Sequence, residues 1–577
     1  MDKKEVARIL EEIGTFLELK GENSFKVRAY YNAARAIEAT SDDLHALAKE
    51  EKLDEIPGVG KGIAEKISEL LKRGRSSYHE ELKKEIPTGI LDMLEIPSVG
   101  PKRAKLLHDK LGISSLGELE YACKENRLLD LEGFGEKSQE KILEGIRYHK
   151  HHKEYHLYDQ ALEAAQAILG RLESHRKVQR VSIAGSLRRR KEIIRDIDFL
   201  VSSKEPTAVM NYFTSLDAVQ KVDQKGETKS IVILKSGIQA DLRVVSDKEF
   251  PYALHHLTGS KEHNVAMRSR AQKRKMKMNE YGLFKVSGPK ERLIPCKDEE
   301  EIFKALGLRY IEPELRENMG EIEAAEKGKL PDLVGENDIR GVFHVHSMYS
   351  DGADRIEALA KKAKILGYEY LGLSDHSKTA YYAHGLDETR LKQQQKEIDE
   401  VNKKVAGIKI LKGAEVDILP DGTLDYPDRI LKALDFVIIS IHSRFNMPET
   451  EMTNRILKAM RHPSVTLFAH PTGRLLLARE PYAVNLEKLF GAAKEHGVAI
   501  ELNGNPHRLD LDWRYIKLAK EIGVRFAINP DAHHLDGLAD TRFGVGIARK
   551  GWLEKEDILN TLPLSKLTPV LEKKRLN

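Results

Sequence analysis

Cysteine is almost absent from the sequence, and long apolar runs are missing altogether. Two of the 577 residues are cysteine, Cys123 and Cys296, which excludes a disulfide framework, and we expect both thiols to be inert. No run reaches the ~18 apolar residues that a membrane-spanning helix needs, and the amphipathic N-terminus has no apolar signal core. We therefore expect a cytoplasmic protein without a membrane partner.

A strong net charge is also missing, because 95 lysines and arginines almost balance 91 aspartates and glutamates and leave a formal charge of +4. This balance does not by itself indicate a nucleic-acid partner. Two local basic patches, residues 188–191 and 268–277, are more informative because they lie beside a cluster of aspartates at residues 196–241. The length predicts several domains, each of about 100–200 residues.

The first 150 residues have the pattern of successive helices separated by short glycine-containing turns. The turn at residues 56–60 contains Gly58, Val59 and Gly60 and precedes a basic helix. Its glycines allow a tight bend whose backbone N–H groups point outward at a helix start, where they can hold a phosphate oxygen without reading a base. This is the pattern of a helix-hairpin-helix element.

Two further turns repeat this pattern. At residues 96–100, Ser98 replaces the first glycine before Val99 and Gly100, so we expect a less open turn, and residues 132–135 are the weakest match. For any one copy, an ordinary packing joint between helices is an equal alternative. Two good copies in one helical region favour binding to the DNA backbone.

Three aspartates and a Gly-Ser pair mark a candidate site for nucleotidyl transfer. Asp196 and Asp198 lie two residues apart in a strand-like run and so share a face, and Asp241 lies in a second run positioned to pair alongside. Three convergent carboxylates can hold two divalent cations about 3.5–4 Å apart, one at the attacking hydroxyl and one at the leaving pyrophosphate. Gly185-Ser186, just before a helix, would face triphosphate oxygens. The alternative, solvated strand ends, fits an isolated Asp-x-Asp better than this combination.

After residue 338, short apolar runs alternate with helical stretches, which is an α/β pattern. In a parallel barrel the ends of such runs converge on one face, where active sites lie. A lone buried histidine is more often a core residue than a ligand, but nine ligand-type residues at run ends favour a metal site: His344, His346, Asp351, His376, Glu415, His442, His470, Asp531 and His533. The run at 498–502 supplies none of these ligands. Mixed histidine and carboxylate ligation suits Zn²⁺ or Mn²⁺.

With these motifs, residues 1–317 resemble a family X DNA polymerase, the class that includes DNA polymerase beta. The Gly-Ser pair with the three aspartates carries the resemblance, together with the segments 257–260 and 264–268. The resemblance implies Mg²⁺ or Mn²⁺ at the aspartates, with Asn264 at the incoming base and Arg268 on the template side. The implied nucleotide-binding residues are Gly185, Ser186, Arg188 or Arg189, Gly259, Asn264 and Arg268. His256-Leu257 replaces two aromatic residues common in the family, so we expect sugar discrimination and nucleotide affinity to differ.

The same resemblance implies a third chemistry in the helical region. Lys66 aligns by motif with the lysine that forms a Schiff base at abasic sites, and Lys26 and Tyr30 lie in a second matching segment, with DNA-binding roles. Such a lysine needs a depressed pKa, which a neighbouring cation such as Lys26 can provide. The alternative is a surface lysine that only meets phosphate, and the two readings stay open.

Residues 339–575 resemble the polymerase and histidinol phosphatase (PHP) domain. The resemblance implies three ions of Mn²⁺ or Zn²⁺ with overlapping ligand sets. The first would be held by His344, His346, Glu415 and Asp531, the second by Glu415, His442 and His470, and the third by Asp351, His376 and His533. A bound water of lowered pKa would attack phosphorus at such a cluster. All nine positions are filled, so we expect a competent centre.

Together these observations predict a multidomain chain: an N-terminal all-α helix-hairpin-helix region, an α+β nucleotidyltransferase palm and thumb, and a C-terminal distorted TIM-like (β/α)7 PHP barrel. The expected boundaries are 1–85 lyase-like, 86–150 helix-hairpin-helix, 151–245 palm, 246–317 nucleotide selection, 318–338 linker and 339–577 PHP. The predicted function is gap filling in DNA repair with 3′-5′ exonuclease activity, by a monomer that binds gapped or primer–template DNA and dNTPs. The alternatives are a PHP small-molecule phosphatase fused to a DNA-tethering module with a vestigial transferase, and a non-catalytic DNA-end scaffold.

Overall fold

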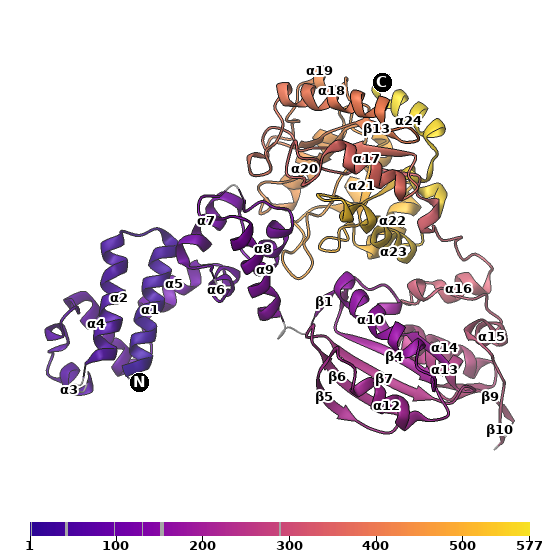
Figure 1. The fold of residues 1–577 in the computed structure, drawn as a ribbon, viewed down its shortest axis with the longest axis horizontal. Coiled ribbons are helices and arrows are strands. Elements are labelled where there is room, and N and C mark those ends of the chain that lie inside the picture. The colour runs from indigo at the N-terminus through magenta and orange to yellow at the C-terminus, as the bar shows by residue number, and fades with distance from the viewer. Residues whose placement is uncertain are drawn as a thin grey trace. The chain divides into compact units, whose positions relative to one another are not determined.

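The computed structural model describes residues 1, 3–40, 44–96, 98–129, 131–150, 155–287 and 290–576. Pro97 of the second turn and residues 151–154, where the palm is expected to begin, lie outside the described residues. The chain divides into two compact units, Met1–His149 and Lys150–Asn577 (Figure 1). Each unit has its own apolar core. Among the described residues no helix is both long and apolar enough to cross a membrane.

The first unit is helical throughout its described residues, as predicted. Helices α1 and α2 pack on each other through Leu10, Ile13 and Ile37, which are fully buried. The Asn23 side chain caps α2, and Ser115 caps α8. The elements are α1 (Lys3–Lys20), α2 (Ser24–Ala39), α3 (Leu44–Lys49), η1 (Leu53–Glu55), α4 (Lys61–Arg73), α5 (Ser77–Glu85), α6 (Thr88–Leu94), α7 (Pro101–Leu111), α8 (Leu116–Lys124) and α9 (Glu136–Lys150).

The second unit begins with a five-stranded sheet in the order β2-β4-β7-β6-β5. Its strands are β2 (Arg180–Ile183), β4 (Asp196–Ser202), β5 (Val219–Lys225), β6 (Lys229–Leu234) and β7 (Gln239–Val245), and β4 pairs with β7 in parallel while the other pairs are antiparallel. Ile197 and Phe199 of β4 pack into the core with α10 (Tyr158–Glu173) and α12 (Pro206–Thr214). Leu200 points to the other face and packs on α13 (Phe250–Thr258). The short elements β1 (His156–Leu157), α11 (Gly185–Arg188) and β3 (Ile193–Ile194) complete this part.

A helical subdomain with a small antiparallel sheet follows α13. It contains α14 (Lys261–Lys273), β8 (Met276–Asn279), β9 (Gly282–Ser287), β10 (Lys290–Leu293), α15 (Glu299–Ala305) and η2 (Pro313–Leu315). The segment expected as a linker contains α16 (Glu321–Glu326) and η3 (Glu336–Asp338). Ile322 and Ala325 of α16 are buried against Phe303, and Glu321 is fully buried beside His263. This connection is therefore packed against the subdomain that precedes it.

The C-terminal half is an α/β domain whose strands are all parallel. One sheet has the order β11-β12-β13 and the other β14-β15-β16-β17-β18. The strands are β11 (Gly341–Val342), β12 (Tyr370–Leu373), β13 (Lys409–Lys412), β14 (Glu415–Asp417), β15 (Ile438–Ser440), β16 (Leu467–Phe468), β17 (Ala499–Asn503) and β18 (Phe526–Asn529). The helices are α17 (Ile356–Ile365), α18 (Glu388–Lys404), α19 (Asp428–Leu431), α20 (Glu449–Met460), α21 (Leu486–His496), α22 (Trp513–Ile522), α23 (Thr541–Lys550) and α24 (Leu564–Leu576). Short 3₁₀ turns lie at η4 (Tyr381–Ala383), η5 (Asp536–Asp540), η6 (Lys555–Asp557) and η7 (Leu559–Thr561).

Two parallel bridges join these sheets into one ring. His376 pairs with Glu415, which links β12 to β14, and Val345 pairs with Ala532, which links the chain after β11 to the chain after β18. Gly413 lies between β13 and β14. No side chain fits at this position, because a Cβ would lie 2.2 Å from the Phe436 ring. Since all strands point the same way, their carboxyl ends meet at one edge of the ring.

Candidate functional site

The palm aspartates lie on adjacent parallel strands. Asp198 of β4 is in register with Asp241 of β7, and Asp196 shares the face of Asp198 opposite the buried Ile197. Asp241 accepts a hydrogen bond from Gln239 Nε2 at 2.8 Å. The structure thus brings together the three aspartates that the sequence singled out.

Gly185 lies directly over this cluster. Its φ is +62°, and a Cβ would come within 2.0 Å of Asp198 Oδ2, so no side chain fits here. Burial first, and then the charges of Asp196 and Asp241, raises the pKa of Asp198 to about 7. Packed carboxylates that resist ionisation in this way are suited to binding cations. Ser186 follows in α11, and its carbonyl accepts the Lys191 N–H at 3.1 Å.

Arg188 and Arg189 both contact Thr258, the last residue of α13. Arg188 donates to Thr258 Oγ1 and to Glu299 Oε2, both at 2.6 Å. Arg189 donates to the Thr258 carbonyl and lies against Gly259, whose Cβ would be 3.2 Å from Arg189 Nη1. Of the two, Arg189 is the one whose charge opposes the raised pKa of Asp198. Arg189 is therefore close enough to Asp198 for its charge to act on that carboxylate.

Asn264 and Arg268 both lie on α14. Asn264 donates from Nδ2 to the His256 carbonyl at 2.7 Å, and its Oδ1 is buried without a hydrogen bond among the described residues. Arg268 lines a cavity of about 510 Å³ with Lys275, Met276 and Lys277. One helix thus carries both residues expected to meet bases.

The three glycine-containing turns of the first unit have one backbone geometry. The first residue has positive φ in each, +96° at Gly58, +75° at Ser98 and +85° at Gly133. The middle residue is buried, and its N–H donates to a carbonyl three residues earlier at 2.9 to 3.0 Å. Ser98 therefore forms the same turn as a glycine, which corrects the expectation of a less open second copy. The third copy, the weakest match in sequence, has this geometry too.

Each turn also starts a helix with an open backbone face. Gly60 is the N-cap of α4 and Gly100 the N-cap of α7, and a Cβ at either would meet nothing within 4 Å. Val59 and Val99 are 4% and 2% exposed, so their side chains fix the turns from inside, while Gly60 and Gly100 face open space. Backbone donors at a helix start are positioned for phosphate oxygens.

Lys66, Lys26 and Tyr30 gather around one ring that the sequence reading did not single out. Lys66 Nζ lies 4.8 Å and Lys26 Nζ 6.0 Å from the centroid of Tyr78, and the Tyr30 ring stacks on it at 6.4 Å. Lys66 Nζ also donates to the Gly62 carbonyl at 3.1 Å. Tyr78 follows α4 on the next helix, so only the fold brings it to these residues.

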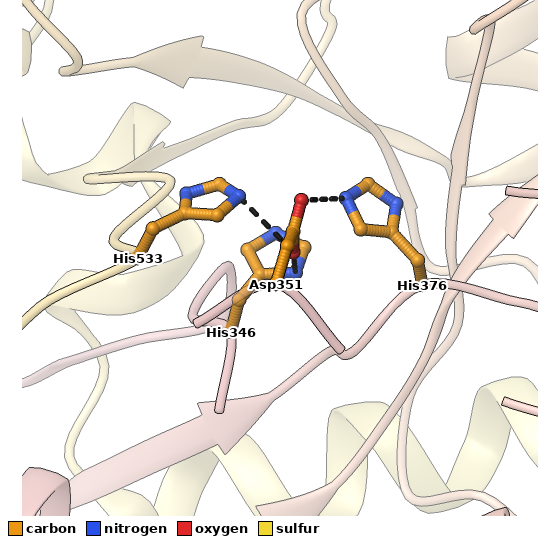
Figure 2. A group of neighbouring side chains, drawn as sticks. All are labelled: His346, Asp351, His376 and His533. Atoms are coloured by element: carbon orange, nitrogen blue, oxygen red, sulfur yellow. Dashed lines mark ion pairs between the residues drawn. The ribbon is translucent and has the colours of Figure 1, made fainter. Parts of the chain in front are cut away.

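At the carboxyl edge of the ring, Asp351 lies among three histidines (Figure 2). Its carboxylate oxygens are 3.7 Å from His346 Nδ1, 3.5 Å from His376 Nε2 and 3.4 Å from His533 Nε2. One atom from each of these four residues lies within 4.8 Å of all the others. His346, expected at the first ion, therefore also reaches the set expected for the third.

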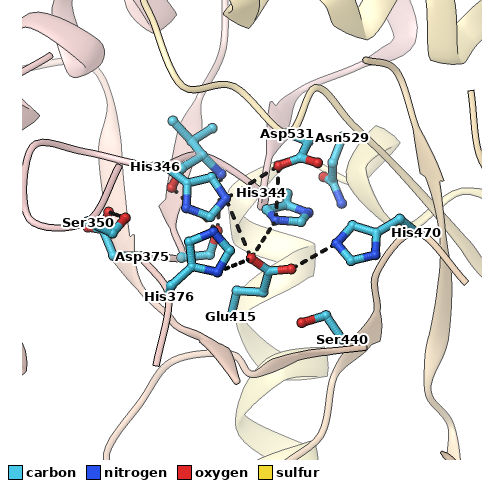
Figure 3. A network of polar contacts seen from close by, with 12 residues as sticks. His344, His346, Ser350, Asp375, His376, Glu415, Ser440, His470, Asn529 and Asp531 are labelled. Carbon is cyan, nitrogen blue, oxygen red and sulfur yellow. Dashed lines mark hydrogen bonds and ion pairs between the residues drawn. The ribbon is translucent and has the colours of Figure 1, made fainter. Parts of the chain in front are cut away.

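Glu415 occupies the centre of the cluster (Figure 3). Its Oε2 is 3.4 Å from His344 Nε2, 3.7 Å from His346 Nε2 and 2.9 Å from His376 Nδ1. Its Oε1 is 3.3 Å from His442 Nε2 and 2.9 Å from His470 Nε2. Asp531 Oδ1 lies 3.3 Å from His344 Nε2 and 3.4 Å from His346 Nε2. All nine predicted ligand residues thus converge.

Two carboxylates behind the histidines were missed at the level of sequence. Glu501 of β17 is fully buried and holds His344 Nδ1 at 2.7 Å, and Asp417 holds His442 Nδ1 at 2.5 Å. Each leaves the other ring nitrogen facing Glu415. Such partners set the tautomer and orientation of metal-binding histidines. The period-2 spacing of Glu415 and Asp417 was a usable signal, whereas β17 had been set aside as a strand without ligands.

The cluster has the chemistry of a site for divalent cations. Within the described residues, His344 Nε2, both ring nitrogens of His346 and of His376, and Glu415 Oε2 are buried without a hydrogen bond. Burial alone would raise the pKa of Glu415, but the adjacent histidines hold it well below its usual range. Buried polar atoms without hydrogen bonds are rare unless a ligand satisfies them. The residues present therefore fit the ions that the fold implies.

Comparison with known protein families covers both halves. A helix-hairpin-helix domain matches residues 1–76, a SAM-like helix-hairpin-helix tandem 90–147, the DNA polymerase beta thumb 253–317 and the PHP domain 343–505. The DNA polymerase/3′-5′ exonuclease PolX of Bacillus subtilis is 39% identical over 575 residues, which are 99% of this chain and 100% of that protein. A probable phosphatase of a Thermoanaerobacter species is 30% identical over 244 residues, 40% of this chain and 94% of that protein. A probable phosphatase of Acetivibrio thermocellus is 32% identical over 202 residues, 33% of this chain and 78% of that protein.

The full-length relative and the matched domains agree with the two clusters found in the fold. The chain belongs to the family X DNA polymerases that carry a C-terminal PHP domain. The predicted class of fold, with its N-terminal helical region, thumb and PHP domain, is thereby confirmed. Asp531 and His533 lie beyond the matched part of the PHP domain, and the structure places them beside its other ligands.

Proposed function

We propose that this chain fills short gaps in DNA with its palm and trims 3′ ends with its PHP cluster. The observation that carries the proposal is the coexistence of two separate clusters of candidate metal ligands, a half-buried one in the palm and a buried one in the PHP domain, in one chain that aligns over its length with a polymerase/exonuclease. If the transferase were vestigial in a PHP phosphatase, there would be no reason for the aspartates of β4 and β7 to remain aligned side by side. A role in DNA repair, in a monomer, is part of the same proposal.

In the palm, Asp196, Asp198 and Asp241 would hold Mg²⁺ or Mn²⁺. Ions there would activate the primer hydroxyl and neutralise the charge that develops on the triphosphate. Arg189 lies beside Asp198 and against Gly259, a position from which it can meet triphosphate oxygens. Asn264, with a buried amide oxygen that lacks a hydrogen bond, is assigned to the incoming base.

In the PHP domain, Mn²⁺ or Zn²⁺ would fill the cluster, which has ligands for up to three ions. Divalent ions at such a site lower the pKa of a bound water for attack on phosphorus. Glu415 reaches five histidines and is assigned as the shared ligand. Glu501 and Asp417 orient His344 and His442 from behind. Because some similar proteins are named probable phosphatases, hydrolysis of a small phosphomonoester is the second candidate for this centre.

The first unit would hold the DNA backbone through its three turns, which present N–H groups and read no base. Abasic-site cleavage is a further candidate activity of this unit. Its support is the cluster of Lys66 and Lys26 about the Tyr78 ring, which holds the candidate Schiff-base lysine beside a second cation. The competing assignment for Lys66 is phosphate binding alone.

A primer assay with Mn²⁺ tests the central proposal. A gapped duplex with a labelled primer is incubated with and without dNTPs, and histidinol phosphate is offered in parallel. Extension with dNTPs and shortening without them are the expected results. Phosphate release from histidinol phosphate with neither extension nor shortening would favour the phosphatase alternative, and no reaction on any substrate would favour a scaffold.

A further inference from the structure

The palm turn that carries the arginines is held by two helices of the PHP domain. At the start of α22, Trp513 Nε1 and Arg514 Nη1 each donate to the Glu192 carboxylate at 3.0 Å. Arg190 packs over Gly546 of α23, where a Cβ would lie 3.0 Å from Arg190 Cδ. The two halves of the second unit therefore meet at the residues that immediately follow the Gly-Ser pair.

Lys550, at the end of α23, is the buried centre of this contact. Its side chain is fully buried, and Nζ donates to Glu317 Oε1 at 2.5 Å and to the Arg189 carbonyl at 3.0 Å. Nζ also lies 4.4 Å from the centroid of the Trp513 ring. A lysine is seldom buried so completely unless its charge is paired. Here the hydrogen-bond acceptors Glu317 and the Arg189 carbonyl belong to the polymerase half of the chain.

Glu317 connects Lys550 to the guanidinium of Arg189. The Glu317 carboxylate accepts from Arg189 Nε at 3.1 Å and lies 3.4 Å from Lys191 Nζ. Arg189 is therefore fixed twice by one PHP lysine, through its own carbonyl and through Glu317. While Lys550 neutralises Glu317, the carboxylate exerts less pull on Arg189. Without Lys550 the full negative charge acts on Arg189, and a triphosphate has to compete for the guanidinium.

We propose that Lys550 of the PHP domain is a positioning residue of the polymerase site, which keeps Arg189 oriented and available for the nucleoside triphosphate. The inference rests on the proposed function, because it takes Arg189 as a triphosphate ligand. It adds that the exonuclease domain is a structural part of the nucleotide site. An ion pair that served only to join the domains would affect stability and leave the KM for dNTP unchanged.

The test measures KM and kcat for dNTP with the full chain on a gapped duplex. Lys550→Met keeps the length of the side chain and removes its charge and donors. We expect KM to rise about five- to tenfold, the size expected from loss of one hydrogen-bonded contact, while kcat and 3′-end degradation stay within about twofold. Lys520→Met is the matched control, since Lys520 on α22 pairs with Glu554 and Asp557 inside the PHP domain. It should leave KM unchanged.

The variant Arg189→Ala distinguishes a failure of this inference from a failure of the proposed role of Arg189 in triphosphate binding. If Arg189→Ala leaves KM unchanged, the nucleotide-binding assignment fails and the role of Lys550 fails with it. If Arg189→Ala raises KM but Lys550→Met does not, the positioning role is overturned while the assignment of Arg189 stands. The double variant combines Arg189→Ala with Lys550→Met. If its KM is no higher than that of Arg189→Ala, the proposal is supported; if the two increases in KM multiply, the proposal is overturned. Should Lys550→Met lose degradation through misfolding, Glu317→Gln is added to it, because a neutral pair leaves no uncompensated carboxylate beside Arg189. A KM near the parent value in this pair supports the proposal, and a KM raised about five- to tenfold in the pair, consistent with the loss of one hydrogen-bonded contact, overturns it.

Discussion

Replacing Glu415 by alanine should reduce metal affinity and activity at the PHP centre more than the loss of a ligand that binds a single ion. The carboxylate lies within 3.7 Å of five histidines, with Oε1 facing two of them and Oε2 three. Loss of even an outer contact to a metal ligand costs about 10–100-fold in affinity or activity, so a carboxylate shared by two ions should cost about 10²- to 10⁴-fold. Breaking a buried charge pair, at about 3–5 kcal/mol, gives a similar range.

The assay pairs metal analysis of the purified protein with separate measurements of extension and degradation. We expect Glu415→Ala to lose at least one bound ion and at least 100-fold of its 3′-end degradation, consistent with the lower bound for two weakened ions, while extension survives. His533→Ala, which belongs to one ligand group only, should lose less. Asp435→Asn is the control, because Asp435 accepts the Lys412 N–H and belongs to no ligand group of the described residues. Full metal content and normal trimming in Glu415→Ala would refute the shared-ligand reasoning.

Four further outcomes are expected. Asp198→Ala should abolish extension and spare degradation; extension within tenfold of the parent enzyme would contradict the palm assignment. Borohydride should trap the chain on nicked abasic DNA, and equal trapping by Lys66→Ala would move the Schiff base to another residue. Changing Gly58 and Gly60 to valine should weaken binding equally for all sequences, with log K linear in log salt, whereas an altered sequence preference would refute phosphate binding by the turn. Burial lowers the pKa of Lys550 to about 8; Glu317 opposes this shift, and the charges of Lys191 and Arg189 add to it. Lys550 therefore loses its charge above that pH. The KM for dNTP should rise from pH 7 to 9 in the parent enzyme and rise less in Lys550→Met.

Local spacing was enough to predict the elements that carry the two clusters. Asp196 and Asp198 share a strand face because side chains alternate with period 2, and the partner strand with Asp241 follows from its own apolar run. The ligands of the PHP centre were predictable because parallel strands end at one edge. The second turn was harder, since Ser98 adopts a φ of +75° that its residue type does not favour. There the buried Val99 and the N-cap Gly100 override the preference of the serine.

The residues that could not be predicted are those whose partners lie far away in the chain. In the sequence, Glu501 has the pattern of a core-facing strand residue. Its partner His344 lies more than 150 positions earlier, and only the folded domain brings the two together. Tyr78 has no distinguishing sequence signal, and only the fold places it beside Lys26 and Tyr30 of α2. In the sequence, Lys550 resembles any basic residue at the C-terminal end of a helix, where its charge would interact favourably with the helix dipole. Only the packing of α23 on the palm turn shows that its charge is buried.

The hydrogen bonds from Glu501 and Asp417 to the histidines have a kinetic consequence. Because folding of the PHP domain already fixes the imidazole groups of His344 and His442, the rotational entropy of these side chains is lost before any ion arrives. An incoming ion then meets nitrogen lone pairs that are already aimed, and little rearrangement separates the empty centre from the filled one. Exchange of one divalent ion for another at this candidate site would therefore require only shedding of water and release of ligands, with the ring of strands left folded throughout.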